Sequence, residues 1–150
     1  IVFNPVSDEL FTAKKGCGAF LNGKPIRFSD VDDMSISMLV TGFPYNVSTN
    51  PCNCIDEFVE VIQSGIPIRR LGSAALDLAY VAAGRFEGFW EVYLHPWDVA
   101  AGVLIVEEAG GKVTQYSQKE FSIFDKTILA TNSKVHEQIS QMLMKCRCGV

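Results

Sequence analysis

The chain of 150 residues lacks the features that mark several classes of protein. No apolar run approaches the roughly 20 residues that cross a membrane. No basic stretch followed by an apolar core marks a signal peptide. Positive charge is not in excess, because the formal net charge is -4, and nucleic-acid binders usually carry a basic face. These absences favour a cytoplasmic protein with no nucleic-acid partner and no membrane partner.

A disulfide framework is also missing from the pattern of cysteines. The chain has five, an odd number, and four of them form the C-x-C pairs Cys52/Cys54 and Cys146/Cys148. Most zinc sites use C-x₂-C spacing instead. Reduced thiols in a cytoplasmic setting are therefore expected. A Cys₄ zinc site built from the two pairs is kept as an alternative, and metal analysis of the purified protein would test it.

What the sequence does contain is an alternation of strand-like and helix-like segments. Apolar residues make up 48% of the chain and charged residues 20%, which is ordinary for a globular domain. Such alternation is typical of an α/β protein. The expected fold is a layered α/β sandwich with a mostly parallel C-terminal sheet flanked by helices. The helices are expected at 54–64, 74–83, 99–109 and 134–145.

The first 28 residues have a different pattern. Short strands there are joined by turn-like stretches, including Asn22-Gly23, which is the strongest short hairpin signal. This predicts an antiparallel meander at residues 1–28, interpreted as the remnant of an N-terminal sheet. The α/β domain then occupies residues 29–150. Because Ile1 already reads as strand, we expect the chain to be part of a longer protein.

The rest of the chain is organised around the stretch from Glu91 to Gly111. A strand is expected at 86–93, and Pro96 breaks the pattern. The helix that follows Asp98 is almost wholly apolar, which is typical of a buried helix. Asp98 is interpreted as the N-cap of that helix, a role that aspartate favours. A carboxylate at this junction also suits Mg²⁺, which binds oxygen donors. His95 is interpreted as a turn residue and His136 as a surface residue.

A second strand-to-helix junction lies at Gly72-Ser73-Ala74. Ligands of open α/β sheets bind outside the carboxyl ends of strands, and free amides at a helix start accept anions or hydroxyls. The alternative is that these small residues only allow close packing. Arg69 and Arg70 lie near the end of a strand expected at 66–71 and are interpreted as strand-end or subunit-contact residues, with a phosphate clamp as the alternative.

The segment Pro96-Trp97-Asp98-Val99-Ala100-Ala101-Gly102, followed by Glu108-Ala109-Gly110-Gly111, resembles the C-terminal signature of the inositol monophosphatase family. These enzymes are magnesium-dependent, lithium-sensitive phosphatases. The resemblance implies hydrolysis of a small-molecule phosphate monoester with two or three Mg²⁺ ions. It implies that Asp98 is a metal ligand and catalytic residue, and that Glu91 with Gly72, Ser73 and Ala74 contacts the substrate hydroxyls. It also implies a homodimer.

The family also carries an earlier glutamate ligand and an Asp-Pro-x-Asp-Gly-Thr motif, and this sequence has no D-P-x-D-G-[ST]. The missing N-terminal half of the same fold is therefore an expected partner. The chain alone is expected to bind Mg²⁺ weakly and to be inactive. Two alternatives remain: a catalytically incomplete binding or assembly module, and a phosphatase for histidinol phosphate, adenosine bisphosphate or fructose bisphosphate.

Overall fold

The computed structural model describes residues 1–146, which form two sheets and four helices. The first sheet contains β1 (Val2–Asn4), β2 (Glu9–Ala13), β3 (Ala19–Leu21) and β4 (Lys24–Pro25). The second contains β5 (Leu39–Thr41), β6 (Ile68–Arg69), β7 (Gly88–Val92), β8 (Lys112–Thr114) and β9 (Thr127–Thr131). The helices are α1 (Cys54–Gln63), α2 (Ala74–Ala82), α3 (Pro96–Glu108) and α4 (His136–Lys145).

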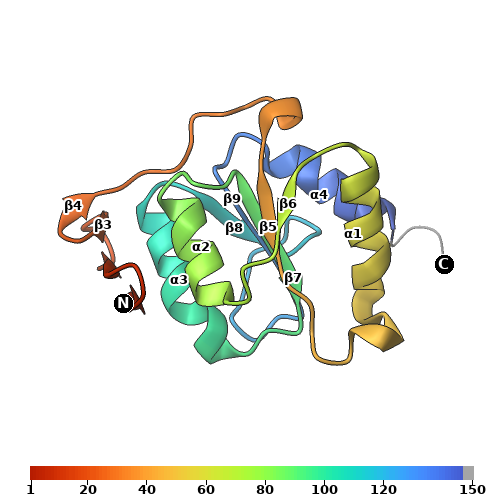
Figure 1. The fold of residues 1–150 in the computed structure, drawn as a ribbon, viewed down its shortest axis with the longest axis horizontal. Coiled ribbons are helices and arrows are strands. Elements are labelled where there is room, and N and C mark those ends of the chain that lie inside the picture. Colours follow the sequence, from red (N-terminus) through yellow and green to blue (C-terminus); the bar gives the residue numbers. More distant parts are fainter. Residues whose placement is uncertain (147–150) are drawn as a thin grey trace.

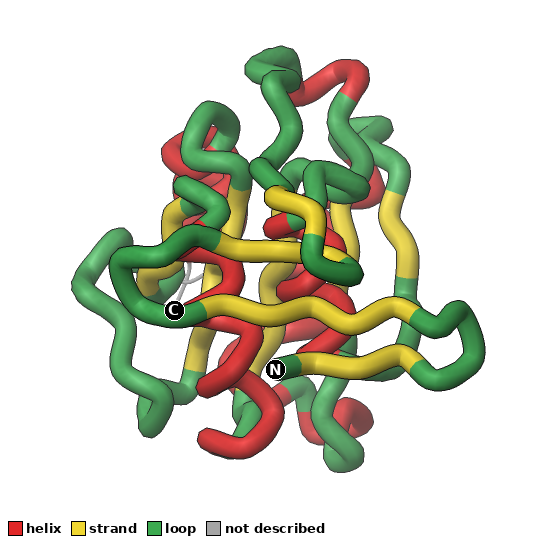
Figure 2. The backbone as a smooth tube through the Cα atoms, turned by 90° about the vertical axis from the view of Figure 1, so that its left-hand side faces the viewer, coloured by secondary structure: helices red, strands yellow, loops and turns green. Residues whose placement is uncertain are grey.

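The elements stack in layers (Figure 1). The pair α1 and α4 covers one face of the five-stranded sheet, and the pair α2 and α3 covers the other. The four-stranded antiparallel sheet packs on the outer side of α2 and α3, and in Figure 2 its strands cross in front of the helices. The α/β sandwich with an additional antiparallel sheet is thus confirmed.

The five-stranded sheet has the order β6-β5-β7-β9-β8 and is mixed. Strand β5 pairs in parallel with both β6 and β7, whereas β9 pairs antiparallel with β7 and β8. The expectation of a mostly parallel sheet is therefore wrong for half of the pairings. No helix separates β8 from β9 in the described residues, and β9 lies beside β8 in the opposite direction.

Helix α3 is apolar on nearly every side because both of its sides are covered. It packs against α2 and lies between the two sheets. One continuous core joins the two sheets through these helices, with Phe11 from β2, Leu78 from α2 and Ile105 from α3 all fully buried. The expected boundary between an N-terminal meander and an α/β domain at residue 28 stays a prediction. The core contains residues from both sides of that position.

A polar contact fastens the first sheet to the end of α3. The Glu108 carboxylate accepts hydrogen bonds from the backbone N–H groups of Gly16 and Gly18, at 2.7 and 2.8 Å. These bonds hold the pKa of Glu108 below its usual range. The glycine-rich turn between β2 and β3 is thereby held against the α/β part of the molecule.

His136 is buried, and the expectation of a surface position is wrong. It begins α4, and its two ring nitrogens each lie 2.8 Å from a threonine hydroxyl, Thr114 on β8 and Thr131 on β9. The sequence predicted the helix correctly but could not show that its first residue contacts two strands and is buried against them. Burial, with a smaller effect of the Lys112 charge, lowers the pKa of His136 to about 4.

This burial predicts a loss of stability in weak acid. The unfolded chain takes up the proton near pH 6.5, whereas the folded protein takes it up near pH 4. The contribution of His136 to the free energy of unfolding should therefore fall by about 3 kcal/mol as the pH drops through this window, while the buried acids Asp77 and Glu91 contribute in the opposite sense. Thermal unfolding of wild type and variants between pH 4 and 8 measures the difference. The pH dependence of His136→Gln should differ from that of the wild type by this amount, whereas His95→Gln, which removes the exposed histidine, should match the wild type; equal pH dependences in both variants would contradict the prediction.

None of the helices in residues 1–146 is long and apolar enough to span a membrane. Within the same residues, Cys17, Cys54 and Cys146 are free thiols. Cys148, which the alternative zinc site requires, lies outside the described residues.

Candidate active site

A groove of about 950 Å³ opens where the parallel strands end. The chain leaves the carboxyl ends of β5, β6 and β7 into the loops that line it, and α2 and α3 begin at its wall. The loops after β5 and β7 lie at the lower edge of the sheet in Figure 1. This is the place where open α/β sheets bind ligands. All five predicted site residues line the groove: Gly72, Ser73, Ala74, Glu91 and Asp98.

Asp98 lies in the first turn of α3 and is half-buried. The helix begins earlier than expected, at Pro96, so His95 is the N-cap and the N-cap interpretation of Asp98 is wrong. Proline is favoured in the first helical turn because its missing N–H would be unpaired there. Asp98 Oδ2 accepts a hydrogen bond from the His95 N–H at 2.9 Å. No hydrogen bond within residues 1–146 reaches Oδ1, which leaves that oxygen available to a ligand.

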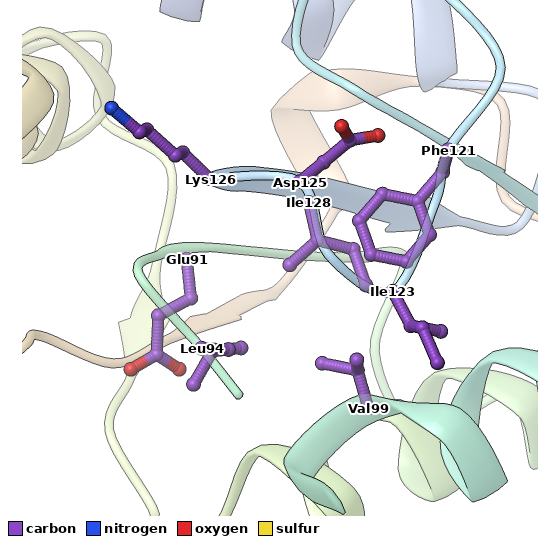
Figure 3. Close-up of a pocket in the computed structure, with 8 residues that line it drawn as sticks. All are labelled: Glu91, Leu94, Val99, Phe121, Ile123, Asp125, Lys126 and Ile128. Atoms are coloured by element: carbon purple, nitrogen blue, oxygen red, sulfur yellow. The ribbon is translucent and has the colours of Figure 1, made fainter. Parts of the chain in front are cut away.

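Glu91 occupies the second-last position of β7 and is 8% exposed. Figure 3 shows its carboxylate pointing away from the apolar side chains of Phe121 and Ile123. The hollow on that side has no room for a water molecule. Burial raises the pKa of Glu91 to about 7, the charges of Asp77 and Asp98 add to the rise, and the charge of Arg70 opposes it.

The junction Gly72-Ser73-Ala74 has the geometry of a helix start. Gly72 has a φ of +88°, which a residue with a side chain rarely adopts, and Ser73 is the N-cap of α2. The Ser73 hydroxyl accepts a hydrogen bond from the Leu76 N–H at 3.5 Å. The remaining N–H groups of the first turn lack partners inside the helix and are available to an oxygen ligand.

Asp77 is a groove residue that the sequence analysis missed. It lies in the first turn of α2, is 1% exposed, and its Oδ1 has no hydrogen-bond partner in the described structure. Burial raises its pKa to about 7. An acidic residue in the first turn of a helix is ordinarily explained by its favourable interaction with the helix dipole, so Asp77 did not stand out as a site residue. Its spacing of three residues from Ala74 was the pattern that could have placed it on the groove side.

Replacing Asp77 by asparagine should stabilise the protein at neutral pH. Because the pKa of this carboxyl is raised on folding, its burial costs stability increasingly as the pH rises from about 4 to about 7. The Asp77→Asn variant should therefore gain about 1–3 kcal/mol in the free energy of unfolding at pH 8 and less at pH 5. Thermal unfolding at both pH values, without added metal, is the measurement.

The control is Asp56→Asn, which changes an exposed aspartate in the first turn of α1. It should lose a few tenths of a kcal/mol at most through the helix dipole. A destabilised Asp77→Asn variant at pH 8 would show that the Asp77 carboxylate has a stabilising partner.

Arg70 and an aromatic rim complete the groove. The Arg70 guanidinium lies 4.5 Å from the ring centroid of Phe43 and lines the groove. Its positive charge acts on Glu91, one of the acidic residues in the same lining. The loop at Thr41–Pro44 lines the groove as well. Trp97 is 76% exposed at the rim and stacks on His95 with a centroid distance of 4.5 Å. That stack agrees with a turn role for His95.

The groove offers part of a metal-binding site. Asp98 offers one carboxylate oxygen without a partner, and such an oxygen suits a hard cation. However, residues 1–146 contain no group of three or more histidine, cysteine, aspartate or glutamate side chains that could hold a metal ion. The chain fits the role of one ligand donor and not of a complete metal site.

Comparison with known proteins decides the family. The sequence profile of the inositol monophosphatase family matches residues 1–147. The chain belongs to this family. It is 44% identical over 143 residues to "Inositol-1-monophosphatase" of Synechocystis, a match that covers 95% of this chain and 50% of that protein. It is 44% identical over 135 residues to "Nus factor SuhB" of Escherichia coli, covering 90% of this chain and 51% of that protein.

The fold agrees with solved structures of the family. The structure of inositol monophosphatase from Anabaena superposes with a TM-score of 0.87 at 45% identity, covering 95% of this chain and 57% of that one. The chain therefore spans about half the length of the relatives that it matches. Family membership identifies the chain with a family of phosphatases that is generally metal-dependent.

Proposed function

We propose that these residues belong to a magnesium-dependent phosphatase that hydrolyses inositol monophosphate or a related sugar phosphate. This chain supplies one metal ligand, Asp98, and the contacts to the substrate hydroxyls. The observation that carries the proposal is the position of Asp98 and Glu91 on one groove, at the carboxyl ends of the parallel strands. Their sequence spacing of seven residues agrees with the family resemblance.

The residues of the groove divide the work by their chemistry. Glu91 accepts hydrogen bonds from hydroxyls of the polyol and is poorly suited to bind the phosphate, which carries the same charge. The N–H groups at the start of α2, beside Ser73 and Ala74, offer donors to the substrate oxygens. Bound Mg²⁺ would polarise the phosphate and activate the attacking water. Asp98, with its unpartnered oxygen, would hold the metal from this side.

An incomplete set of metal ligands explains why the proposal concerns the full-length protein. The further metal ligands have to come from outside residues 1–146, because these residues hold no group of three or more side chains that could bind a metal ion. We therefore propose that this chain alone binds Mg²⁺ weakly and is inactive. The homodimer and the cytoplasmic location remain predictions from the sequence.

The test measures phosphate release from inositol 1-phosphate by the full-length protein that carries these residues. Activity is expected with Mg²⁺ and should disappear after chelation with EDTA and return when Mg²⁺ is added back. Histidinol phosphate, adenosine bisphosphate and fructose bisphosphate are assayed in parallel to identify the branch. Absence of activity towards every phosphate monoester would reject the proposal.

The second candidate is a binding or assembly module. It is favoured by the equal identity, 44%, to a relative whose name is that of a Nus factor and not of a phosphatase. The two functions are separable in the same assay. An assembly module would fold normally, as circular dichroism would show, yet release no phosphate at any Mg²⁺ concentration.

A further inference from the structure

We infer that Gly42 is a positioning residue of the substrate site, and that the missing side chain at this position determines where the Glu91 carboxylate lies. The inference rests on the proposed function and adds a residue that selects for polyol leaving groups. Gly42 follows β5 directly, at the point where the chain turns into the groove loop.

The distances leave no space for a side chain. A Cβ atom built on Gly42 would lie 2.4 Å from both oxygens of the Glu91 carboxylate and 2.5 Å from its Cδ. Separations this short do not occur between unbonded atoms in stable packing. The Gly42 backbone itself does not have a positive φ, so alanine can adopt its conformation. The requirement for glycine is therefore one of space.

The neighbouring strands hold Gly42 in place relative to Glu91. Thr41 pairs with Trp90 in the parallel register of β5 and β7, and the Thr41 hydroxyl donates to the Trp90 carbonyl at 2.6 Å. The backbone that leads into Gly42 and the backbone at Trp90 are thus held by the sheet. A new methyl group at position 42 has to displace the Glu91 side chain, because the backbone is fixed.

The surroundings of Glu91 decide where its carboxylate would go. The hollow on the other side of Glu91, lined by apolar side chains such as Leu94 and Ile128 and also by Asp125 and Lys126, has no room for the carboxylate. Asp77, which lines the groove at the first turn of α2, repels the carboxylate from that part of the groove, as its effect on the pKa of Glu91 shows. The open direction is the groove, so the displaced carboxylate would enter the volume meant for substrate hydroxyls.

A flexible side chain moves at little energetic cost, so Gly42→Ala should change function without unfolding the protein. In the full-length protein, kcat/KM for inositol 1-phosphate should fall about 10- to 100-fold, the effect of losing a hydrogen bond to a charged group. The loss for p-nitrophenyl phosphate, whose leaving group has no hydroxyls, should be at least about tenfold smaller. The Tm should shift by no more than about 2 °C.

The double-mutant cycle with Glu91→Ala tests whether Gly42 acts through Glu91. In the Glu91→Ala background the obstacle is gone, so Gly42→Ala should have no further effect on kcat/KM for inositol 1-phosphate. Additive losses would overturn the inference, as would an unchanged Gly42→Ala enzyme, an equal loss for both substrates, or a collapse of the Tm. Wild-type protein without phosphatase activity would instead reject the proposed function, and this inference with it.

Discussion

Replacing Asp98 by asparagine should reduce phosphate release from inositol 1-phosphate by about 100-fold or more in the full-length protein. The reason is charge. Asparagine keeps the shape of the side chain and can still accept the hydrogen bond from the His95 N–H, but it loses the negative oxygen offered to the metal. Metal ions stabilise the charge of the transition state by several kcal/mol, and each 1.36 kcal/mol corresponds to a tenfold change in rate.

The measurement is kcat/KM as a function of Mg²⁺ concentration. The variant should need more Mg²⁺ for half-maximal activity, which a general loss of folding would not cause. The matched control is Glu107→Gln on the same helix, since Glu107 is exposed near its other end and lines no groove. Turnover and Mg²⁺ dependence that stay unchanged in Asp98→Asn would remove Asp98 from the metal site.

The Gly102→Val substitution should lower the free energy of unfolding by about 3 kcal/mol or more. Gly102 lies buried in the middle of α3, where α3 crosses α2. A Cβ atom at this position would lie 2.6 Å from both Cβ and Cδ1 of Leu78, a fully buried residue. Helices with a glycine at the contact approach more closely than helices with side chains there, so any larger residue forces them apart.

Urea or thermal unfolding of the variant measures this effect. Ala100→Val on the exposed side of the same helix is the control, since it changes helix propensity by about 0.5 kcal/mol without changing the packing. Similar losses in both variants would mean that the helix pair adapts to a larger residue at Gly102. Because α2 and α3 also carry Ser73 and Asp98 at the groove, Gly102→Val should weaken activity as well as stability.

Local sequence patterns predicted the elements of this fold well. The Asn22-Gly23 turn, the amphipathic spacing of α1 and the apolar run of α3 each depend on residues close together in the chain. The direction of β9 was not predictable in this way. Two strands joined by a loop pair in whichever direction the packing favours, and the segment between residues 114 and 127 carries no signal that decides it.

The residues of the candidate site also differ in how far local sequence patterns predict them. Asp98, Glu91 and the Gly72–Ala74 junction were predicted because their motifs are contiguous and resemble a known family. Asp77 was missed, because an acid in a first helical turn has an ordinary local explanation. Arg70 was assigned to a strand end, with the phosphate clamp only as the alternative, and Gly42 was not singled out within its loop. His136 was misplaced because periodicity along α4 cannot reveal what covers its first turn.

The amino-acid order by itself determined which segments become strands and helices and which carboxylates stand at their ends, since these properties depend on neighbours within a few positions. The tertiary structure alone decided which of those ends meet. Gly42, Asp77 and Glu91 come from three different elements, and they share one groove only because β5 and β7 pair in parallel while α2 packs beside them. Proximity of this kind depends on packing between distant segments, which no local pattern encodes.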